Sequence, residues 1–472
     1  MSSQSALTYT VKEDTICALA TPPGAGAIAV IRVSGPQTYD ILEKIFQPAG
    51  SKKEISETNT HTLRFGNILE DNYQVLDEVL VSFFRKPHSY TGEDSVEISC
   101  HGSQYIQQKL LELLMQKGAR LAQPGEFTMR AFSNGKMDLS QAEAVNDLIS
   151  AHSKTSHELA LNQMRGGYSS RIRDLREQLV NFASLIELEL DFSEEDVEFA
   201  NRDDLKELLG KLKKEIRELV QSFSVGNVIK QGIPVTIIGD TNVGKSTLLN
   251  AILNEEKAIV SEVPGTTRDV VEDSIIINGV TFRFIDTAGL RHTTDKVETI
   301  GIERTYEKIN QARIVLYMFD ISKTSCDEVT EHLKDFEEHI KDSNKKFIVI
   351  GNKIDQLVET PKSFGKMVEL DCVFVSAKRK ENISMVVDHL LKAVDTDRLE
   401  DSTVVSNARH YNELTKSLEA IENIETGFRQ GIPSDLISID IRTALHHLGE
   451  ITGEITTDEI LGNIFSKFCI GK

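Results

Sequence analysis

The sequence predicts a multi-domain fold: an α+β domain at the N-terminus, an all-α helical domain, and an α/β P-loop domain inserted into the helical one. Three observations predict it. A chain of 472 residues is too long for a single hydrophobic core. A phosphate-loop motif follows a strand-like run at residues 235–238. Helical periodicity occurs both before and after the segment that carries this motif.

The N-terminal zone alternates short β-like runs with turns. The apolar run at 27–33, for example, follows the turn sequence Thr21-Pro22-Pro23-Gly24. Short β-like runs of this kind, separated by turns, favour an α+β domain. We therefore place the first domain at residues 1–125.

Helical spacing dominates the zone before the phosphate loop and returns near the C-terminus. Leucine and isoleucine residues at 205, 208, 209, 212, 216 and 219 fall on one face of a helix that begins near Asp203. The same spacing recurs at Leu414, Leu418 and Ile421 and at Ile441, Leu445 and Leu448. Neither part would bury a large core alone. We expect residues 126–231 and 393–472 to pack together as one helical domain, with residues 232–392 inserted in it.

The phosphate loop spans residues 239–246 and reads G-D-T-N-V-G-K-S. A loop of this pattern turns backbone N–H groups toward phosphate oxygens. Lys245 would add its ammonium group near the terminal phosphates, and Ser246 would offer its hydroxyl to Mg²⁺. Because a strand-like run precedes the loop and a helix-forming segment follows it, the pattern predicts a bound nucleotide.

Two later motifs select the base. In Asn352-Lys353-Ile354-Asp355, the Asp355 carboxylate can accept hydrogen bonds from guanine N1–H and from its exocyclic amino group. Adenine has an acceptor at N1 and no amino group at C2, so it would leave a buried charge unpaired. Ser376-Ala377-Lys378 would support the same base through its backbone. In this order, after a phosphate loop, these motifs predict GTP.

Two further segments are candidate switches, at 258–269 and 286–300. Asp286-Thr287-Ala288-Gly289 ends a predicted strand that pairs back through the turn signal Asn278-Gly279. Asp286 would hold Mg²⁺ through water, and the Gly289 amide would face the γ-phosphate. Thr267 would bind the metal only when the γ-phosphate is present.

The catalytic apparatus is predicted partly from what is missing. Leu290 stands where many small GTPases place a glutamine that orients water. Charge that develops on the phosphates also needs a positive partner. Asn242, together with residues 261–266, could cage a monovalent cation, or Asn242 could be a plain turn residue. The sequence leaves these two interpretations open.

Composition limits the remaining function classes. Lys plus Arg number 53 and Asp plus Glu 73, which gives a net charge of −20 and argues against a general nucleic-acid coat. The five cysteines have no metal-ligand spacing, so we expect reduced thiols. We find no charged leader and no apolar run long enough to span a bilayer. The expected location is the cytoplasm, without a membrane partner.

The motifs together resemble the MnmE (TrmE) family of tRNA modification GTPases. The segments that carry the resemblance are the phosphate loop, AIVSEVPGTTRDV at 258–270, DTAGLR at 286–291, VETIGIERT at 297–305 and FCIGK at 468–472, and the resemblance covers the whole chain. It implies a K⁺-activated GTPase that dimerises its GTP-binding domains across the nucleotide. Pro264 departs from the pattern within the potassium loop but leaves carbonyl ligands available.

The resemblance also implies roles for individual residues. Asn242, Ser261, Val263 and Thr266 would line the K⁺ site, Ser246 and Thr267 would bind Mg²⁺, and Glu298 would orient water through an intermediary. Glu298, Asn242, Lys245 and Cys469 are the candidate catalytic residues. The nucleotide-binding set is Asn242, Val243, Gly244, Lys245, Ser246, Thr247, Ser261, Glu262, Val263, Pro264, Gly265, Thr266, Thr267, Asp286, Thr287, Ala288, Gly289, Asn352, Lys353, Asp355, Ser376, Ala377 and Lys378.

A second site is implied at the two ends of the chain. The family's first domain, which also dimerises, resembles tetrahydrofolate-binding enzymes, and Arg32, Glu97, Lys136 and Lys472 match its folate-binding residues. A carboxylate suits the donors of a pterin, and cations suit a glutamate tail. Without the resemblance, single charged residues of this kind would be read as solvent-facing. The family also places Cys469 in the modification site.

The implied function is addition of a carboxymethylaminomethyl group at C5 of wobble uridine (U34) in certain tRNAs. The implied cofactors are Mg²⁺, K⁺ and 5,10-methylenetetrahydrofolate, with 5-formyltetrahydrofolate as an analogue, and GTP is the substrate. The implied partners are a second copy, tRNA and the flavoprotein MnmG (GidA) in a heterotetramer. Two alternatives stay open: an Era-like ribosome-assembly GTPase, and a folate-dependent one-carbon enzyme regulated by GTP.

Overall fold

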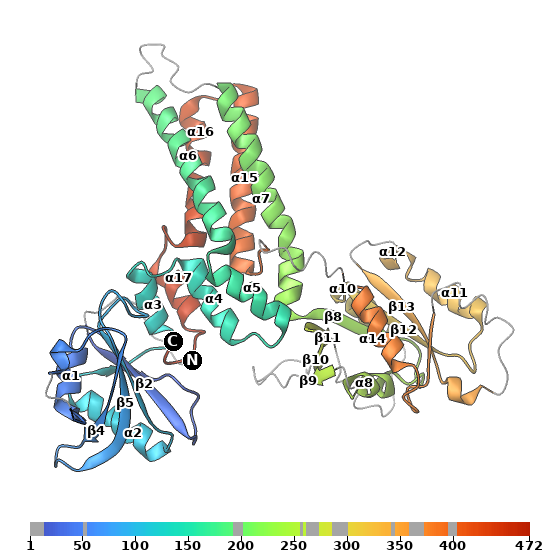
Figure 1. Cartoon of the computed structure of the whole chain (residues 1–472). Coiled ribbons are helices and arrows are strands. Elements are labelled where there is room, and N and C mark those ends of the chain that lie inside the picture. The colour runs from blue at the N-terminus through green and yellow to red at the C-terminus, as the bar shows by residue number, and fades with distance from the viewer. Residues whose placement is uncertain are drawn as a thin grey trace, which may run out of the picture. The chain divides into compact units, whose positions relative to one another are not determined.

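The computed structural model describes residues 14–50, 54–191, 202–254, 258–260, 273–285, 301–340, 345–357, 372–394 and 404–472 (Figure 1). The chain divides into two compact units. The first comprises residues 1–146, 163–200 and 427–472, and the second comprises 147–162 and 201–426. Each unit therefore draws on segments from both halves of the sequence.

The first unit contains a seven-stranded sheet in the order β3-β4-β5-β6-β2-β1-β7. Its strands are β1 (Ile16–Leu19), β2 (Ile28–Ser34), β3 (Phe46–Pro48), β4 (Thr62–Leu69), β5 (Val75–Phe84), β6 (Ser95–His101) and β7 (Arg120–Leu121). All neighbours pair antiparallel except β1 and β7. One face is buried with residues of α1 (Thr38–Ile45) and α2 (Gln104–Gln116). The predicted α+β character of the N-terminal zone is confirmed.

The C-terminal chain of the first unit packs on helices from the middle of the sequence. These elements are α3 (Glu126–Ser133), α4 (Leu139–Ile149), α6 (Gly167–Asp191), α16 (Ser434–Thr452) and α17 (Asp458–Phe465). Met129 and Val145 share a buried cluster with Leu461, Phe465 and Phe468. Helix α16 lies beside α6. Arg176 on α6 pairs with Glu454, which follows the end of α16. The last residues are thus carried to the N-terminal sheet.

The second unit is built on another seven-stranded sheet, in the order β14-β13-β12-β8-β11-β10-β9. The strands are β8 (Ile233–Ile238), β9 (Ala258–Val260), β10 (Asp273–Ile277), β11 (Val280–Phe284), β12 (Ile314–Asp320), β13 (Lys346–Asn352) and β14 (Val373–Val375). Helices α8 (Lys245–Leu253), α10 (Gly301–Gln311), α11 (Cys326–Lys334), α12 (Glu337–Ile340) and α14 (Ile383–Lys392) complete it. β12 is buried at every residue, as expected for a central parallel strand.

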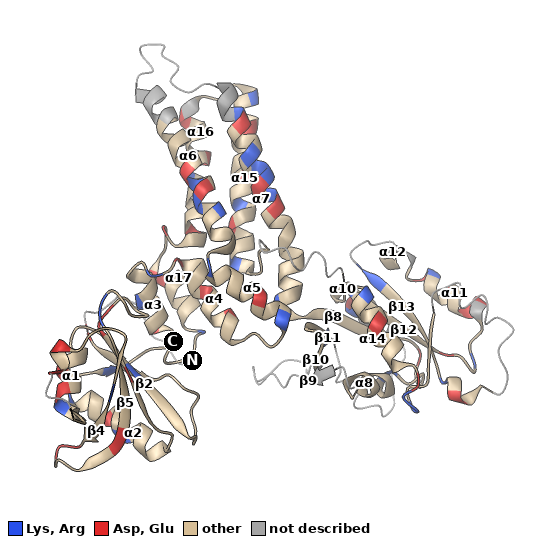
Figure 2. Cartoon of the chain, viewed as in Figure 1, with Lys and Arg blue, Asp and Glu red and all other residues tan. Residues whose placement is uncertain are grey.

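Three more helices belong wholly or mainly to the second unit: α5 (Lys154–Met164), α7 (Arg202–Gln231) and α15 (Ala408–Gln430). The predicted apolar face of α7 is confirmed, because its residues at 209, 212, 216 and 219 are buried. Lys213 pairs with Glu425 at 2.7 Å, and the rings of Phe223 and Tyr411 stack at 4.4 Å. Figure 2 shows both charge signs interleaved along α7 and α15.

Helix α7 contacts the residues on both sides of the P-loop segment. α7 ends at Gln231, and β8 begins two residues later. On the return, the Val405 amide donates to Ser222 Oγ at 3.0 Å, and a Cβ at Gly226 would lie 2.2 Å from the Val405 carbonyl oxygen. Val405, after the P-loop segment, therefore lies against α7, the helix that directly precedes that segment. The boundaries at 125, 231 and 392 stay predictions.

Candidate functional site

The phosphate loop connects β8 to α8 at the carboxyl edge of the second sheet. Its backbone needs glycine at two positions. Gly239 has φ +139°, and a Cβ there would lie 2.0 Å from the Met318 carbonyl oxygen. Gly244 precedes α8 with φ +102°, and a Cβ there would lie 2.5 Å from Asn352 Nδ2. Both neighbours hold the loop tightly, so its N–H groups are fixed in direction.

Lys245 begins α8 and folds back over the loop. Its ammonium group donates to the carbonyl oxygens of Gly239 and Asp240, both at 2.7 Å. Burial lowers the pKa of Lys245, and the Asp240 carboxylate opposes this. The positive charge is therefore held at the mouth of the loop, beside the half-buried Ser246. Asn242 is exposed and has φ +63°, which fits a turn and leaves its side chain accessible.

Asn352 joins the phosphate loop to the base-recognition loops. It ends β13 and is 3% exposed. Its Nδ2 donates to the Val243 carbonyl oxygen at 2.7 Å, and its Oδ1 accepts from the Ala377 amide at 2.9 Å. One buried amide group thus fixes the predicted phosphate and guanine segments relative to each other.

Asp355 and Ser376 also meet, as the predicted guanine pocket requires. Ser376 Oγ donates to Asp355 Oδ1 at 2.7 Å and accepts from the Arg379 amide at 3.2 Å. The first bond occupies one carboxylate oxygen of Asp355 and orients the other. Lys378 is exposed beside this loop. The hydroxyl of Ser376 therefore positions the residue predicted to read the base.

Sequence reasoning missed the partner of Lys353. This residue has φ +71°, and its ammonium group donates to Asp320 Oδ2 at 2.7 Å. Asp320 ends β12, is 5% exposed, and also accepts from the hydroxyl and amide of Ser322. Burial raises the pKa of Asp320, but bonds from Lys353 and Ser322 outweigh it and keep the pKa below its ordinary value. The position of Asp320, at the end of an apolar run, is the signal that could have found it.

Part of the predicted site lies outside the described residues. It comprises Ser261, Glu262, Val263, Pro264, Gly265, Thr266, Thr267, Asp286, Thr287, Ala288, Gly289 and Glu298. The hairpin between these segments is described: β10 and β11 pair antiparallel around Asn278 and Gly279. The predicted hairpin is therefore confirmed, while the switch, Glu298 and K⁺-loop assignments stay predictions.

The second predicted site begins with a cross-strand ion pair. Arg32 on β2 lies opposite Glu97 on β6, and its Nη2 donates to Glu97 Oε1 at 2.7 Å. The guanidinium carbon also lies 5.1 Å from the ring centre of Tyr90 and 5.6 Å from that of Phe127. Two aromatic rings and a carboxylate therefore fix the guanidinium group.

The C-terminal residues reach this pair. Arg32 Nη1 donates to the Gly471 carbonyl oxygen at 3.4 Å. Gly471 has φ +100°, and a Cβ there would lie 2.3 Å from the Leu19 carbonyl oxygen. Burial lowers the pKa of the Lys472 ammonium, Arg32 lowers it further, and Glu97 raises it. The structure thus brings together three of the four predicted folate residues.

The remaining two candidates at this end are placed differently. Lys136 is exposed, and its ammonium donates to the Pro87 carbonyl oxygen at 2.9 Å. This bond does not join it to the group around Arg32. Cys469 is a free, exposed cysteine, and its carbonyl oxygen accepts from the amides of Gly125 and Lys472. Its thiol is therefore accessible to a large substrate.

A buried ion cluster, also missed from sequence, supports the same region. Arg130 is fully buried and bonds to Asp14 at 2.6 Å, Glu126 at 3.0 Å and Glu93 at 3.2 Å. Arg120 adds bonds to Asp14 and Glu126. The cluster ties the start of β1, the loop that carries Tyr90, and α3, which carries Phe127. It therefore fixes the two rings that enclose Arg32.

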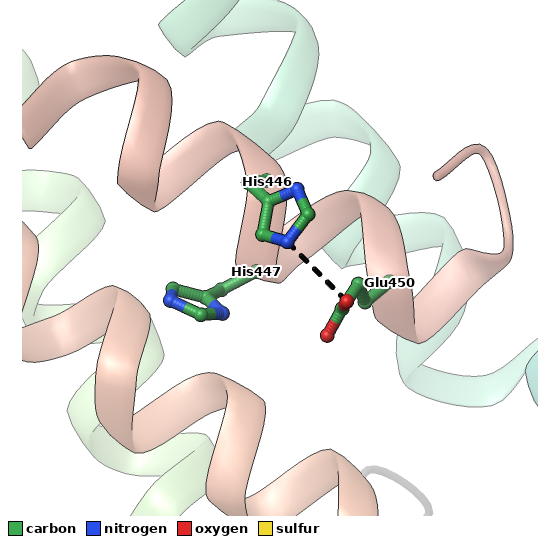
Figure 3. A group of neighbouring side chains, drawn as sticks. All are labelled: His446, His447 and Glu450. Atoms are coloured by element: carbon green, nitrogen blue, oxygen red, sulfur yellow. Dashed lines mark ion pairs between the residues drawn. The ribbon is translucent and has the colours of Figure 1, made fainter. Parts of the chain in front are cut away.

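One group of side chains with metal-ligand chemistry lies elsewhere, on α16. Figure 3 shows His446, His447 and Glu450, whose potential ligand atoms lie within 4.8 Å of one another. His446 Nε2 lies 3.3 Å from a carboxylate oxygen of Glu450, the spacing of an i,i+4 helix pair. His446 is exposed, and its ring lies edge to face with the His447 ring, with the ring centres 5.4 Å apart. The i,i+4 pair accounts for the proximity of His446 and Glu450.

Comparisons with known proteins decide the family. The model of the MnmE helical domain matches residues 139–469, and that of the GTP-binding protein TrmE N-terminus matches residues 15–136. A relative named tRNA modification GTPase MnmE, from Christiangramia forsetii, is 54% identical over 474 residues, covering 97% of this chain and 99% of the relative. The chain belongs to the MnmE family of tRNA modification GTPases. The predicted resemblance is therefore confirmed.

Further relatives with the same name give the same result. The Flavobacterium psychrophilum protein is 53% identical over 465 residues, covering 98% of this chain and all of the relative. The Cytophaga hutchinsonii protein is 53% identical over 469 residues, covering 99% of this chain and all of the relative.

Among solved structures, that of Aquifex aeolicus Era matches 40% of this chain and 66% of the Era chain, with 25% identity and a TM-score of 0.26. No described helix is both long and apolar enough to span a bilayer.

Proposed function

We propose that the protein is a K⁺-dependent GTPase that, with a flavin-dependent partner, adds a carboxymethylaminomethyl group at C5 of wobble uridine in certain tRNAs. Membership of the MnmE family supports the proposed tRNA modification. The two hydrogen bonds of the Asn352 side chain support the proposed binding of a nucleotide. That side chain bonds to Val243 in the phosphate loop and to Ala377 in the guanine loop. This arrangement suits a guanine nucleotide whose base and phosphates are read together.

In this proposal, the described residues bind and orient GTP. The loop amides before α8 and the Lys245 ammonium would contact the phosphates, with Lys245 exchanging its two carbonyl partners for phosphate oxygens. Asp355, oriented by Ser376, would accept from the guanine. Ser246 offers the hard oxygen that Mg²⁺ prefers. We propose Thr267 as its second protein ligand.

Potassium would supply the positive charge near the leaving group. Asn242 is exposed at the loop, so its side-chain oxygen is accessible to a cation. Ser261, Val263 and Thr266 are the other proposed ligands. Glu298 would orient the attacking water through an intermediary. Bound K⁺ would neutralise charge that develops on the phosphates during hydrolysis.

The second site would hold 5,10-methylenetetrahydrofolate, which supplies the one-carbon unit, with 5-formyltetrahydrofolate as an analogue. Glu97 would accept from the donors of the pterin, and Arg32 and Lys472 would bind carboxylates of the glutamate tail. The pairing of Arg32 with Glu97 at 2.7 Å supports a shared site for these two groups. Lys136 would join them from the exposed loop after α3. The exposed Cys469 thiol would assist chemistry on the uridine.

A homodimer is supported by an apolar surface on the open face of the first sheet. Phe65 and Leu80 lie opposite each other on β4 and β5 and are 49% and 42% exposed. Leu63 and Ile28 are also exposed, at 59% and 67%. Arg32 alternates onto the same face as Ile28. A second copy seated on this surface would border the proposed folate site.

The other partners in this proposal are tRNA and the flavoprotein MnmG (GidA), in a heterotetramer. Glycine or ammonium would be the amine source, and the cytoplasm would be the place of reaction. The flavoprotein would supply the redox chemistry.

Two measurements test the proposed function. GTP turnover should be much faster in KCl than in NaCl, and ATP should not replace GTP. Nucleoside analysis of tRNA from cells that lack the protein should show loss of the modified wobble uridine. Equal turnover in the two salts would refute the potassium requirement. Unchanged tRNA would instead favour an Era-like ribosome-assembly GTPase or a folate enzyme regulated by GTP.

A further inference from the structure

Helix α16 carries three side chains with metal-ligand chemistry on one turn. His446, His447 and Glu450 each offer one potential ligand atom, and these three atoms lie within 4.8 Å of one another (Figure 3). Among the residues that the structure describes, no other three histidine, cysteine or acidic side chains come together in this way. The i,i+4 ion pair involves only two of these residues, so it does not account for the approach of His447.

The spacing in the sequence places the three residues on a triangular facet of the helix. Glu450 follows His446 by four residues and His447 by three, and both spacings bring side chains together on a helix surface. The ring of His447 lies edge to face with that of His446, with the ring centres 5.4 Å apart. Each of the three side chains therefore neighbours the other two, and a single ion can reach all of them.

The distances between the ligand atoms fit an ion of the size of Zn²⁺. Donor atoms bound at about 2.0–2.1 Å in tetrahedral geometry lie about 3.4 Å apart. His446 Nε2 and a carboxylate oxygen of Glu450 are 3.3 Å apart. The ligand atom of His447 lies within 4.8 Å of both, so it has to approach by no more than about 1.4 Å, the difference between the two separations. Rotation about side-chain bonds gives a movement of this size.

The backbone below these residues is fixed, while their outer side is open to solvent. Leu448 and Ile451, on the same stretch of α16, are fully buried, so their packing holds this part of the helix in place. The side chain of His446 is 50% exposed and that of Glu450 is 17% exposed. Water can therefore take the coordination position that the three residues leave open.

The combination of donors selects the metal. Two imidazoles and one carboxylate suit Zn²⁺, whereas Mg²⁺ and Ca²⁺ require oxygen ligands. Three donors on one facet occupy three corners of a tetrahedron and cannot surround Cu²⁺ in a square plane. Sites with these donors bind Zn²⁺ more tightly than Mn²⁺ or Fe²⁺.

We propose that His446, His447 and Glu450 form a Zn²⁺ site on α16, with water as the fourth ligand. Bound Zn²⁺ joins side chains that lie one helical turn apart, so it stabilises the helical state of residues 446–450. The site goes beyond the proposed function, because it requires neither nucleotide, folate, tRNA nor a partner protein.

The test is a titration of the full-length protein with Zn²⁺, without nucleotide, in competition with a chromogenic chelator. It measures the number of ions bound per chain and the Kd for the wild type, His446→Gln, His447→Gln and Glu450→Gln. His157→Gln is the matched control, because it removes an exposed histidine from another helix, α5. The cysteines are the same in all five proteins, so a difference in binding reports the site on α16.

The wild type and His157→Gln should bind one more Zn²⁺ per chain than each of the three α16 variants. In those variants the Kd of the site should rise at least about 100-fold, since loss of a residue that only supports a ligand already costs about 10–100-fold. Excess Mg²⁺ should not displace the ion. With free Zn²⁺ at 100 times the Kd, hydrogen exchange that requires opening of this turn should slow about 100-fold in the wild type.

Equal binding of Zn²⁺ by the wild type and the three α16 variants would overturn the proposal. Displacement of the ion by Mg²⁺ would also overturn it, because it would indicate charge attraction without nitrogen ligands. If circular dichroism shows that Glu450→Gln does not fold, His446→Gln decides the question, since it changes an exposed residue. GTP turnover and tRNA modification enter none of these measurements, so failure of this inference is distinct from failure of the proposed function.

Discussion

Replacement of Gly471 by alanine should release the C-terminal residues from the first sheet. A Cβ at this position would lie 2.3 Å from the Leu19 carbonyl oxygen and 3.1 Å from Ala20 Cα. Both are backbone atoms, so no side-chain rotation relieves the clash. The left-handed φ of +100° adds about 1 kcal/mol for alanine. The collision with these backbone atoms adds about 1 kcal/mol more, the lower end of the cost of overpacking.

The two contributions sum to about 2 kcal/mol, which corresponds to about 30-fold in an equilibrium constant. We therefore expect Gly471→Ala to raise the Kd for 5-formyltetrahydrofolate about 30-fold. Isothermal titration calorimetry measures this directly. Trypsin cleavage after the exposed Lys467 should also become faster, and GTP turnover should not change.

A matched control separates the clash from the strain. Gly50 has φ +68° and open space where a Cβ would be added, so Gly50→Ala carries the strain without the collision. It should bind the folate as the wild type does. The reasoning would be refuted if Gly471→Ala bound the folate with unchanged affinity and resisted trypsin as well as the control.

Three further predictions concern the nucleotide pocket and the proposed dimer. Asp355→Asn should lower GTP turnover about 100-fold and favour XTP, whose C2 carbonyl can accept from the new amide; equal use of GTP by both proteins would contradict the guanine assignment. Asp320→Asn should lose about 2 kcal/mol of stability at neutral pH. Because Lys353 and Ser322 hold the pKa of Asp320 below its ordinary value, its contribution is present above pH of about 4 and disappears as pH falls through the lowered pKa. The free energy of unfolding, measured in urea, should thus depend less on pH in the variant than in the wild type. The same pH dependence in both proteins would contradict this role of Asp320. Phe65→Asp should shift sedimentation toward a monomer, whereas Tyr73→Asp, on an exposed turn, should not.

Much of the P-loop domain could be predicted because its signals are local. The phosphate loop lies between β8 and α8, as the strand-like run before it and the helix-forming segment after it predicted. The Asn278-Gly279 turn was found because few residues other than these adopt positive φ readily. Such features depend on neighbouring residues in the chain and on the sterics of each turn.

Long-range pairings could not be predicted in the same way. Arg130 meets Asp14 from 116 positions away, and Arg32 meets Gly471 from 439 positions away. Lys353 meets Asp320 because β12 and β13 are adjacent parallel strands that end together. Neither spacing nor periodicity records such contacts, and the folate residues were selected by resemblance. Lys136, selected in the same way, donates to the Pro87 carbonyl oxygen, and its role in the folate site stays a prediction.

The placement of Asn352 has a consequence for how GTP or GDP leaves. Its single amide group restrains Val243 and Ala377 at once, from a site that is 3% exposed. Movement of either loop displaces the Asn352 side chain and so weakens its bond to the other loop. The protein should therefore release the base and the phosphates in one concerted event. Departure of the nucleotide should accordingly follow a single exponential.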